Sequence, residues 1–528
     1  MRPRLALLTV LCAAALATGL CGQALAAGTG RGGDSGRLTA QQRAVLHGIA
    51  ADTWRFYGAD VDPVTHLPLD NLGPGAVRGA YTSAANIGVY LWAVVAAHDM
   101  HLIDTATAQR LASATLDEVA SLKRYKGFLY QWYDTANGNV LLNPGQGDCP
   151  ATPPTVENNC GFVSAVDNGW YASGLVIARE ALPGVRGLAT RLLGDMDFSI
   201  FYDNRPQTDC NTNASIAGNQ PTGQQYGGYY VYPAPAHPAG YHNGAIYSDP
   251  RISMYMGMGL RQMPGDVWWR TWRTLPPQRC STDPDFSWQG QWPVPGQWET
   301  VTDPLSHKQF QVWEGHYVYS ASPGPPITFI PTFSGGMFEG LMANLVVPET
   351  QWGTHSFGLA DLRWAQVQER YDTQVLHDPV WGMSPSSTPD DTGNYSAFGV
   401  QGLALGPGQG LAQDGCAPTA TAPCTTEDAV TPHASAIALP VIPQQAYANL
   451  QKLRSDYPGL YTADGGFYDS VNPKTGSIGH RRLVLDQSMI MAGLDDALNN
   501  DALQRDFARD PVSWAAKAEL TTERMTIH

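Results

Sequence analysis

The stretch TSAANIGVYLWAVVAAHDM at residues 82–100 decides the fold class of this chain. It is apolar around nearly its whole circumference, whereas a helix at a protein surface keeps one polar face. We therefore predict a helix that is buried on all sides. Such a helix needs a shell of other helices around it, so the stretch favours an all-α fold.

Similar helical patterns continue along the chain on both sides of this stretch. One begins near Leu38, behind a capping box at Thr39. The others lie at 105–122, 162–181, 187–201, 251–262, 336–346, 361–371, 434–439, 443–453, 485–498 and 502–507. Roughly twelve helices joined by long loops predict a toroid in which inner and outer helices alternate.

The connections between these helices are unusually long and aromatic. Many exceed the usual loop lengths, and the stretch 288–319 is rich in Trp, Tyr and Asp. Long loops of this kind over a rigid scaffold are typical of a binding face. With no Ser- or Pro-rich linker, we predict one domain over 38–510 and a C-terminal tail over 511–528. An alternative is two domains with a boundary near 280–330.

The composition excludes several classes of protein. Charged residues make up 15% of the 528 residues, and the formal net charge is −15. A nucleic-acid-binding protein needs a basic face, which this sequence lacks. The 15 Trp, 23 Tyr and 14 Phe argue against a disordered chain. No apolar run after the N-terminal segment reaches the ~18 residues of a membrane span.

The N-terminal segment predicts secretion. Arg2 and Arg4 precede an apolar run over 5–20, and Ala-Leu-Ala at 24–26 fits a cleavage site. We expect a signal peptide over 1–26, a flexible segment over 27–37, and a secreted, extracellular bacterial protein. A permanent anchor is the alternative for the apolar run.

Six cysteines would remain after cleavage, an even number that suggests disulfides outside the cell. Two close pairs flank loops rich in Pro, Thr and Gly, and the third pairing follows by elimination. The expected pairs are Cys149 with Cys160, Cys416 with Cys424, and Cys210 with Cys280. A zinc site is the alternative, but no CxxC spacing supports it.

The common catalytic motifs GxSxG, HExxH and the P-loop do not occur in the sequence. What remains is a set of carboxylates among aromatic or small residues. They are Asp134, Asp167, Asp249, Glu339, Asp469 and Asp486. Aromatic faces stack on sugar rings and paired acids move protons, so this pattern points to carbohydrate chemistry. Each acid alone is more often a helix cap or a buried hydrogen-bond acceptor.

Nine short motifs carry a family resemblance when taken in order. They are TSAANIGVY at 82–90, YQWYD at 130–134, SAVDNG at 164–169, SGGMFE at 334–339, WGMS at 381–384, YSAFGV at 395–400, TPHAS at 431–435, GFYDS at 466–470 and LDQ at 485–487. The set resembles the glucoamylase-like domain family of bacterial glycoside hydrolases. That family is similar to endo-β-1,2-glucanases and to the transglycosylating domain of cyclic β-1,2-glucan synthases. The resemblance implies an (α/α)6 barrel.

The resemblance also suggests catalytic residues. Asp249, in Ser-Asp-Pro-Arg at 248–251, stands where the glucan synthases have a catalytic acid in Ser-Glu-Ala-Arg. Their second catalytic Glu follows a Trp-Gly-Ile-Ser segment, where this chain has Pro385. Because proline cannot move a proton, another acid is needed. The candidates are Asp390, Asp391, Glu339 and Glu314.

Further residues are expected to bind the sugar. The candidates are Asp134, Asp167, Asp486, Trp132, Trp170, Trp313, Tyr317 and Trp381. For the tryptophans, core packing is the competing interpretation. No metal and no organic cofactor is implied.

The sequence therefore predicts a secreted, monomeric glycoside hydrolase that cleaves inside a neutral poly- or oligosaccharide. Three alternatives stay open: a carbohydrate-binding protein without activity, a transglycosylase, and a polysaccharide lyase. The glycan, the linkage and the stereochemical course stay open as well.

Overall fold

The computed structural model describes residues 36–74, 78–205, 223–276, 294–320, 323–400 and 428–527. The described residues from Leu38 onward form one compact unit. That unit includes the described part of 280–330, where a domain boundary was the alternative prediction. Among the described residues, no helix has both the length and the apolar character that a membrane crossing requires.

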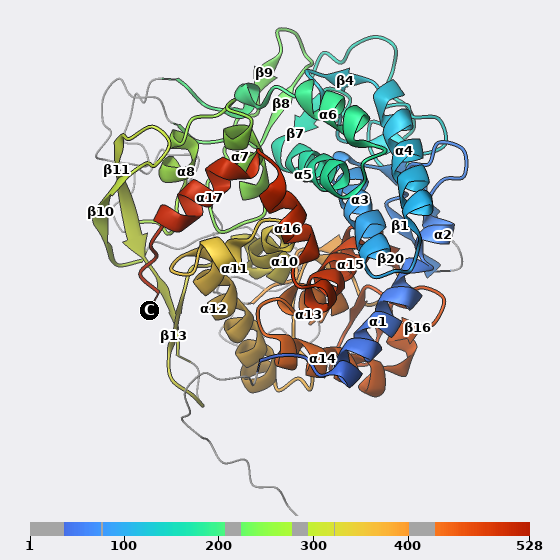
Figure 1. Cartoon of the computed structure of the whole chain (residues 1–528), viewed down its shortest axis with the longest axis vertical. Coiled ribbons are helices and arrows are strands. Elements are labelled where there is room, and N and C mark those ends of the chain that lie inside the picture. Colours follow the sequence, from blue (N-terminus) through green and yellow to red (C-terminus); the bar gives the residue numbers. More distant parts are fainter. Residues whose placement is uncertain are drawn as a thin grey trace, which may run out of the picture. The chain divides into compact units, whose positions relative to one another are not determined.

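Six helices follow one another around a ring (Figure 1). They are α3 (Ala84–Asp99), α5 (Ala165–Ala181), α7 (Arg251–Gly259), α10 (Met337–Leu341), α13 (Pro432–Ala438) and α15 (Val484–Asn499). Neighbours in this order pack against each other, and α15 returns to α3. Between α7 and α10 the link is Arg251, which donates hydrogen bonds to the carbonyls of Glu339 and Gly340.

A second set of helices packs outside this ring. It comprises α1 (Ala40–Trp54) on α3 and α15, α4 (Thr105–Ser121) on α3, α6 (Arg186–Gly194) on α5, α12 (Phe357–Arg370) on α10, α14 (Pro443–Asp456) on α13 and α17 (Ser513–Thr522) on α7. Helix α16 (Ala502–Arg509) contacts α3, α5 and α15 and lies inside the circle of inner helices in Figure 1. Three short helices complete the set: α2 (Tyr57–Asp60), α8 (Asp266–Arg270) and α11 (Glu349–Trp352).

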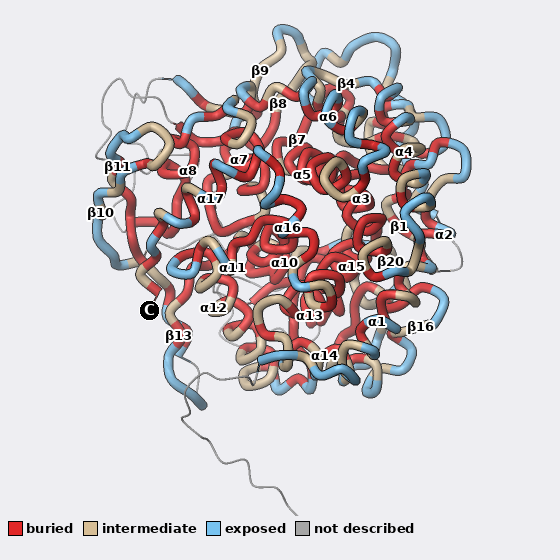
Figure 2. The backbone as a smooth tube through the Cα atoms, in the orientation of Figure 1, coloured by how far each residue is buried: buried red, intermediate tan, exposed pale blue. Residues whose placement is uncertain are grey.

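The inner helices are buried on all sides, as the sequence predicts for 82–100 (Figure 2). In α3 every residue from Ala84 to Ala97 is buried. Helices α3 and α5 approach each other closely, and this approach requires glycine. A Cβ added at Gly88 would lie 2.4 Å from the carbonyl oxygen of Trp170, well inside van der Waals contact.

The strands are short and lie in the loops. Two three-stranded sheets have the orders β2–β1–β20 and β7–β8–β9, and the remaining strands form two-stranded pairs. The strands of two or three residues are β1 (Asn71–Leu72), β2 (Arg78–Gly79), β3 (Tyr81–Thr82), β4 (Arg124–Tyr125), β5 (Phe128–Leu129), β6 (Tyr133–Asp134), β7 (Phe162–Ser164), β8 (Gly228–Tyr230), β9 (His237–Pro238), β12 (Tyr317–Tyr319), β13 (Ile327–Phe329), β14 (Ser386–Ser387), β15 (Tyr395–Ser396), β16 (Tyr461–Thr462), β17 (Gly466–Phe467), β18 (Ser470–Val471), β19 (Ile478–Gly479) and β20 (Arg482–Leu483).

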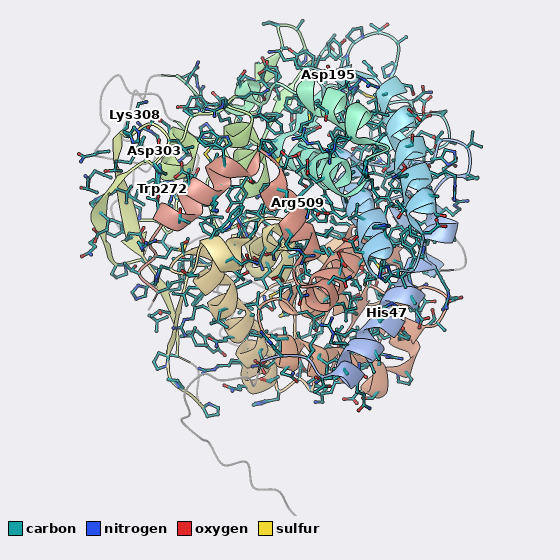
Figure 3. The ribbon with its side chains drawn as sticks, in the orientation of Figure 1. His47, Asp195, Trp272, Asp303, Lys308 and Arg509 are labelled. Carbon is teal, nitrogen blue, oxygen red and sulfur yellow. A yellow bond between two sulfur atoms is a disulfide. The ribbon has the colours of Figure 1, made fainter. Side chains whose placement is uncertain are left out.

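One longer hairpin stands apart from these pairs. Strands β10 (Gly296–Thr302) and β11 (Gln309–Gly315) pair antiparallel, with Gly296 opposite Gly315. Asp303 lies in their turn, and Trp272 lies on the same side of the unit (Figure 3). This hairpin lies within the aromatic stretch 288–319, which was predicted to form a binding face.

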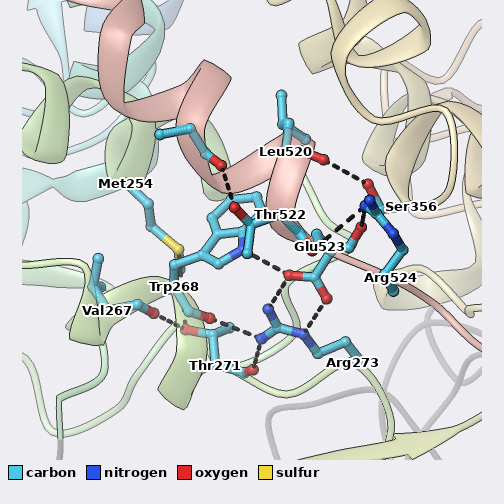
Figure 4. Close-up of polar contacts among 11 residues, drawn as sticks. Met254, Val267, Trp268, Thr271, Arg273, Ser356, Leu520, Thr522, Glu523 and Arg524 are labelled. Carbon is cyan, nitrogen blue, oxygen red and sulfur yellow. Dashed lines mark hydrogen bonds and ion pairs between the residues drawn. The ribbon is translucent and has the colours of Figure 1, made fainter. Parts of the chain in front are cut away.

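The C-terminal segment corrects the prediction of a tail over 511–528. It contains α17, whose Ala515, Ala516 and Leu520 are buried, and it packs against α7 and α11. Glu523, just beyond this helix, accepts hydrogen bonds from Arg273 Nε (3.0 Å) and Trp268 Nε1 (2.8 Å) (Figure 4). The segment is thus anchored by apolar burial and by a buried ion pair.

The predicted disulfide between Cys149 and Cys160 is confirmed. The expected signal peptide and the cysteines Cys210, Cys280, Cys416 and Cys424 lie outside the described residues.

Candidate active site

The first turns of the six inner helices carry polar side chains that meet at one end of the ring. Those side chains are Asn86 (α3), Asp167 (α5), Glu339 (α10), His433 (α13) and Asp486 (α15), with Asp249 directly before α7. Four contacts join neighbouring segments at this end: Trp170 with Asp249, Ser248 with Glu339, Phe338 with His433, and His433 with Asp486. An alternating inner–outer path brings the starts of all inner helices to the same end, so residues far apart in sequence converge there.

Asp249 and Glu339 form a pair of carboxyl groups at this end. They are close enough to share a hydrogen bond. Trp170 Nε1 also donates to Asp249 Oδ2 at 3.3 Å, and Ser248 Oγ donates to Glu339 Oε2. The pair is therefore oriented by α5 on one side and by the segment before α7 on the other.

The pKa of each member of this pair is raised. Burial and, to a smaller extent, the charge of Asp167 raise the pKa of Asp249 to about 6, although hydrogen bonds with Glu339 and Trp170 act in the opposite direction. Burial, followed by the charge of Asp249, raises the pKa of Glu339 well above its usual range. Two carboxylates this close cannot both ionise easily, so the pair holds one proton near neutral pH.

A cavity of about 200 Å³, open to solvent, reaches this pair. That volume is below the ~300–1,000 Å³ of a drug-sized ligand site, so the cavity has room for a small part of a larger ligand beside the pair. Tyr241 and Phe333 supply aromatic surface to it, and Asn243 supplies an amide. The cavity thus combines ring faces, polar groups and a proton donor.

Arg251 holds the two halves of the pair in place. Its side chain is fully buried, and Nε and Nη2 donate to the Glu349 carboxylate at 2.7 and 2.8 Å. Nη1 donates to the carbonyls of Ser248 (2.9 Å) and Glu339 (3.3 Å). The Ser248 carbonyl directly precedes Asp249, and the other carbonyl is that of Glu339 itself. One guanidinium therefore fixes the backbone of both acids.

A second carboxyl pair lies at the next first turns along the ring. Asp469 and Asp486 are buried, and ligand atoms of both lie within 4.8 Å of a nitrogen of His433. The Asp469 carboxylate accepts a hydrogen bond from the Ser387 amide at 2.6 Å. Burial, together with the charge of Asp469, raises the pKa of Asp486 well above its usual range. Burial lowers the pKa of His433 to about 3.

The structure brings four of the predicted site residues together: Asp249, Glu339, Trp170 and Asp167. Asp167 hydrogen-bonds with Ser83 and Gln131, and burial raises its pKa. Trp170 packs edge-on against Trp92 with ring centroids 5.4 Å apart, so it serves core packing and also supplies a donor to Asp249.

Three predicted catalytic acids lie elsewhere. Asp390 caps its own exposed turn by accepting from Thr388 and Thr392, and these hydrogen bonds lower its pKa. Asp391 pairs with His480 (2.9 Å), and its left-handed backbone, with φ of 60°, turns the chain on the surface. Glu314 lies on β11, where burial raises its pKa to about 8. These acids do not line the cavity beside Asp249.

Most of the predicted stacking residues have other neighbours. Trp381 is buried in the core, and its amide and carbonyl bond Asn449. Trp313 packs against Trp298 on the hairpin, and Tyr317 packs against Phe329. Trp132 is half-buried at the edge of a loop and packs against Tyr81. Asp134, another predicted sugar-binding residue, accepts a hydrogen bond from the Ala136 amide in a tight turn. None of these five lines the described cavity.

Sequence reasoning gave no role to Ser248, Tyr241, Arg251 or His433. Ser248 and Arg251 flank Asp249 directly, and His433 stands in the TPHAS motif at 431–435. A signal was therefore present for these three, because each lies in a motif of the resemblance. Tyr241 has no such signal, since its place beside the pair depends on the long loop before α7.

Pro385 lies close to the first turn of α10, which carries Glu339. A Cβ added at Gly336 would lie 2.6 Å from Pro385 Cδ, and the Phe338 amide donates to Ser384 Oγ at 3.1 Å. Ser384 and Pro385 therefore lie against the start of α10. Glu339 projects from that same turn.

Comparison with known proteins agrees with the resemblance. Residues 329–511 match the model of the Glycoamylase family, which is described as a family of candidate glucoamylases. The cyclic β-(1,2)-glucan synthase NdvB of Rhizobium meliloti is 32% identical over 148 residues. This match covers 26% of the chain and only 4% of the synthase, so the chain spans a small part of that relative's length.

Solved structures share the fold at low sequence identity. The endo-β-1,2-glucanase of Chitinophaga pinensis, in complex with sophorotriose and glucose, has a TM-score of 0.61 at 13% identity, covering 90% of this chain and 98% of that one. The endo-β-1,2-glucanase of Talaromyces funiculosus, in complex with sophorose, has a TM-score of 0.57 at 11% identity, covering 88% and 90%. The predicted resemblance to glucoamylase-like proteins and endo-β-1,2-glucanases is thus confirmed.

Proposed function

We propose that the chain is a glycoside hydrolase on an (α/α)6 barrel and that it cleaves a neutral glucan internally. The partly buried Asp249–Glu339 pair, which lines an open, partly aromatic cavity, carries this proposal. The ring order of the inner helices and the outer helix on each of them support the barrel. Similarity to endo-β-1,2-glucanases makes β-1,2-glucan the first substrate to test.

The pair acts as one acid in this mechanism. The two carboxyl groups of a glycosidase ordinarily stand ~5 Å apart in retaining enzymes and ~6.5–9.5 Å apart in inverting ones. Asp249 and Glu339 are within hydrogen-bonding reach, too close for a sugar or a water to enter between them. Glu339, with the higher pKa, holds the shared proton and gives it to the glycosidic oxygen, while Asp249 stays ionised beside it.

Hydrolysis also needs a base that activates water. Asp167 is the candidate, because it projects from the neighbouring first turn and its charge acts on Asp249. Its pKa is raised by burial, which makes its ionised form a stronger base than a solvated aspartate. With Asp167 as base, water attacks the anomeric carbon while the leaving oxygen takes the proton of the pair.

We also propose that the chain is exported, with residues 1–26 as its signal peptide. The Cys149–Cys160 disulfide supports this, because such bonds persist in oxidising compartments. N-terminal sequencing of protein from the culture medium should begin at residue 27. Full-length protein retained in the cytoplasm would refute export.

The function is tested by incubating the protein with a panel of neutral glucans, including β-1,2-glucan, and separating the products by chromatography. Oligosaccharides from β-1,2-glucan are the expected result. Longer products at high substrate would indicate a transglycosylase, and products absorbing in the near ultraviolet a lyase.

A non-catalytic binding protein is the second candidate, because Pro385 replaces an acid of the glucan synthases. It predicts a change in tryptophan fluorescence with one glucan and no product from any. That outcome would overturn the hydrolase proposal.

A further inference from the structure

The cluster of His433, Asp469 and Asp486 differs from the Asp249–Glu339 pair because it contains an imidazole. His433 comes from the first turn of α13, Asp486 from the first turn of α15, and Asp469 from the loop between β17 and β18. One ligand atom from each lies within 4.8 Å of the others, and all three side chains are 1% exposed. Three separate segments therefore converge on one buried point.

The polar atoms that face this point lack hydrogen-bond partners. They are His433 Nδ1, Asp469 Oδ1 and both carboxylate oxygens of Asp486. His433 Nδ1 lies 3.6 Å from Asp486 Oδ2, beyond a normal hydrogen bond. Leaving a buried polar atom unpaired costs free energy, and one site rarely holds four such atoms.

Neighbouring charges do not explain these atoms. Arg481 lies near Asp469, but its Nη1 donates to the carbonyl of Gly393 at 2.7 Å. Asp70 adds another negative charge near Asp486. Asp469 and Asp486 are close enough to share a hydrogen bond when one of them holds a proton. That proton would satisfy one oxygen of each carboxyl group and would leave His433 Nδ1 and the other Asp486 oxygen without a partner.

A cation bound at this point would give a partner to the unpaired atoms of His433, Asp469 and Asp486. We propose that His433, Asp469 and Asp486 bind one divalent transition-metal ion, with Zn²⁺ the first choice. One nitrogen and two carboxylate oxygens suit zinc, which takes three protein ligands when a fourth position stays open. Calcium prefers six to eight oxygen ligands, and magnesium avoids imidazole, so both fit this donor set poorly.

The ion would tie the ring together beside the acid pair. It joins the starts of α13 and α15 to the loop at 468–470, and the His433 ring contacts Phe338, the residue before Glu339. Sequence analysis implied no metal, because the three ligands come from three different motifs without a recognised spacing. This site does not depend on the proposed hydrolase activity.

Metal content tests the proposal directly. The purified protein is dialysed against Zn²⁺, then against metal-free buffer, and its zinc is measured by mass spectrometry against protein concentration. We expect one equivalent of zinc, and we expect a chelator to lower the unfolding temperature by about 3 °C, as for a ligand near a hundredfold above its Kd. Cobalt should bind the same site and give a visible absorption band.

The matched variants are Asp486→Asn, His433→Gln and, as control, Asp249→Asn in the other carboxyl pair. The first two should lose the zinc and the cobalt band, whereas Asp249→Asn should keep both. If either site variant fails to fold, the zinc and cobalt measurements on the wild type still decide whether the protein binds a metal ion. No zinc or cobalt bound by the wild type overturns the proposal, and so does full binding retained in folded Asp486→Asn or His433→Gln.

Discussion

Replacing Arg251 with methionine should lower the stability of the protein and disorganise the acid pair together. Arg251 is fully buried and makes two hydrogen bonds to the Glu349 carboxylate, at 2.7 and 2.8 Å. It also donates to the carbonyls of Ser248 and Glu339. Methionine fills a similar space but donates no hydrogen bond, so Glu349 would be left as a buried, uncompensated charge.

The size of the effect follows from the buried ion pair. Removing one partner of such a pair costs ~3–5 kcal/mol. The compact unit from Leu38 to His528 has an unfolding entropy of about 1 kcal/mol/K, at ~2.1 cal/mol/K per residue. The expected fall in Tm is therefore ~3–5 °C, measured by scanning calorimetry.

The control is the double variant Arg251→Met with Glu349→Leu. Replacing both partners of a buried pair by apolar residues is often neutral or stabilising, so the double variant should regain most of the lost Tm. It should not regain activity, because the carbonyls beside Asp249 and Glu339 stay without their donor. A Tm of Arg251→Met within about 1 °C of wild type would refute the ion-pair reasoning. Full activity in that variant would refute the positioning role.

Three further predictions concern pH and packing. Activity, as kcat/KM, should fall about tenfold per pH unit below about 6, where Asp249 gains a proton; a flat profile to pH 4 would contradict this. Burial and the charge of Asp303 raise the pKa of Glu519 to about 10. The protonated carboxyl therefore makes its full contribution to stability below the pKa of Glu519 in the unfolded chain. That contribution is lost as the pH rises from the unfolded pKa to about 10. Relative to wild type, Glu519→Gln should therefore gain ~1.4 kcal/mol per unit between about pH 5 and 9, and urea titrations at several pH values that show a constant difference would exclude this. Gly88→Ala should lower Tm, because its Cβ would meet the Trp170 carbonyl at 2.4 Å, and an unchanged Tm would show that α3 and α5 can separate freely.

The helices could be predicted from sequence because a buried helix shows a pattern of apolar residues within its own segment. The stretch 82–100 is apolar all round, and α3 is buried all round. Helix α17 has a weaker apolar pattern, since its buried residues include Ser513 and Glu519 beside two alanines and one leucine. The predicted helix at 336–346 ends as α10 at Leu341 and continues as a tighter 3₁₀ turn over 342–345.

The individual acids of the site could be predicted, but their pairing could not. Asp249 and Glu339 are 90 positions apart, and their contact depends on the Arg251 clamp between α7 and α10. Asp390 and Asp391 were chosen because they follow Pro385 closely. In the structure the chain turns outward after Ser387. Asp390 and Asp391 therefore lie away from the cavity, although they are close to Pro385 in sequence.

The most direct test of the account compares reducing-end release from β-1,2-glucan by wild type, Asp249→Asn, Glu339→Gln and Asp390→Asn. All three acids were candidates from sequence or its resemblance, and the structure separates the Asp249–Glu339 pair from the exposed turn that carries Asp390. We expect both variants of the pair to lose activity by at least ~10²-fold, the lower end for a catalytic acid. The Tm should equal or exceed that of wild type, because Asp249→Asn removes the one charge of the pair and Glu339→Gln replaces a protonated carboxyl by a neutral amide. Asp390→Asn should keep full activity. Wild-type rates in Glu339→Gln and Asp249→Asn, or loss of activity only in Asp390→Asn, would contradict the central claim.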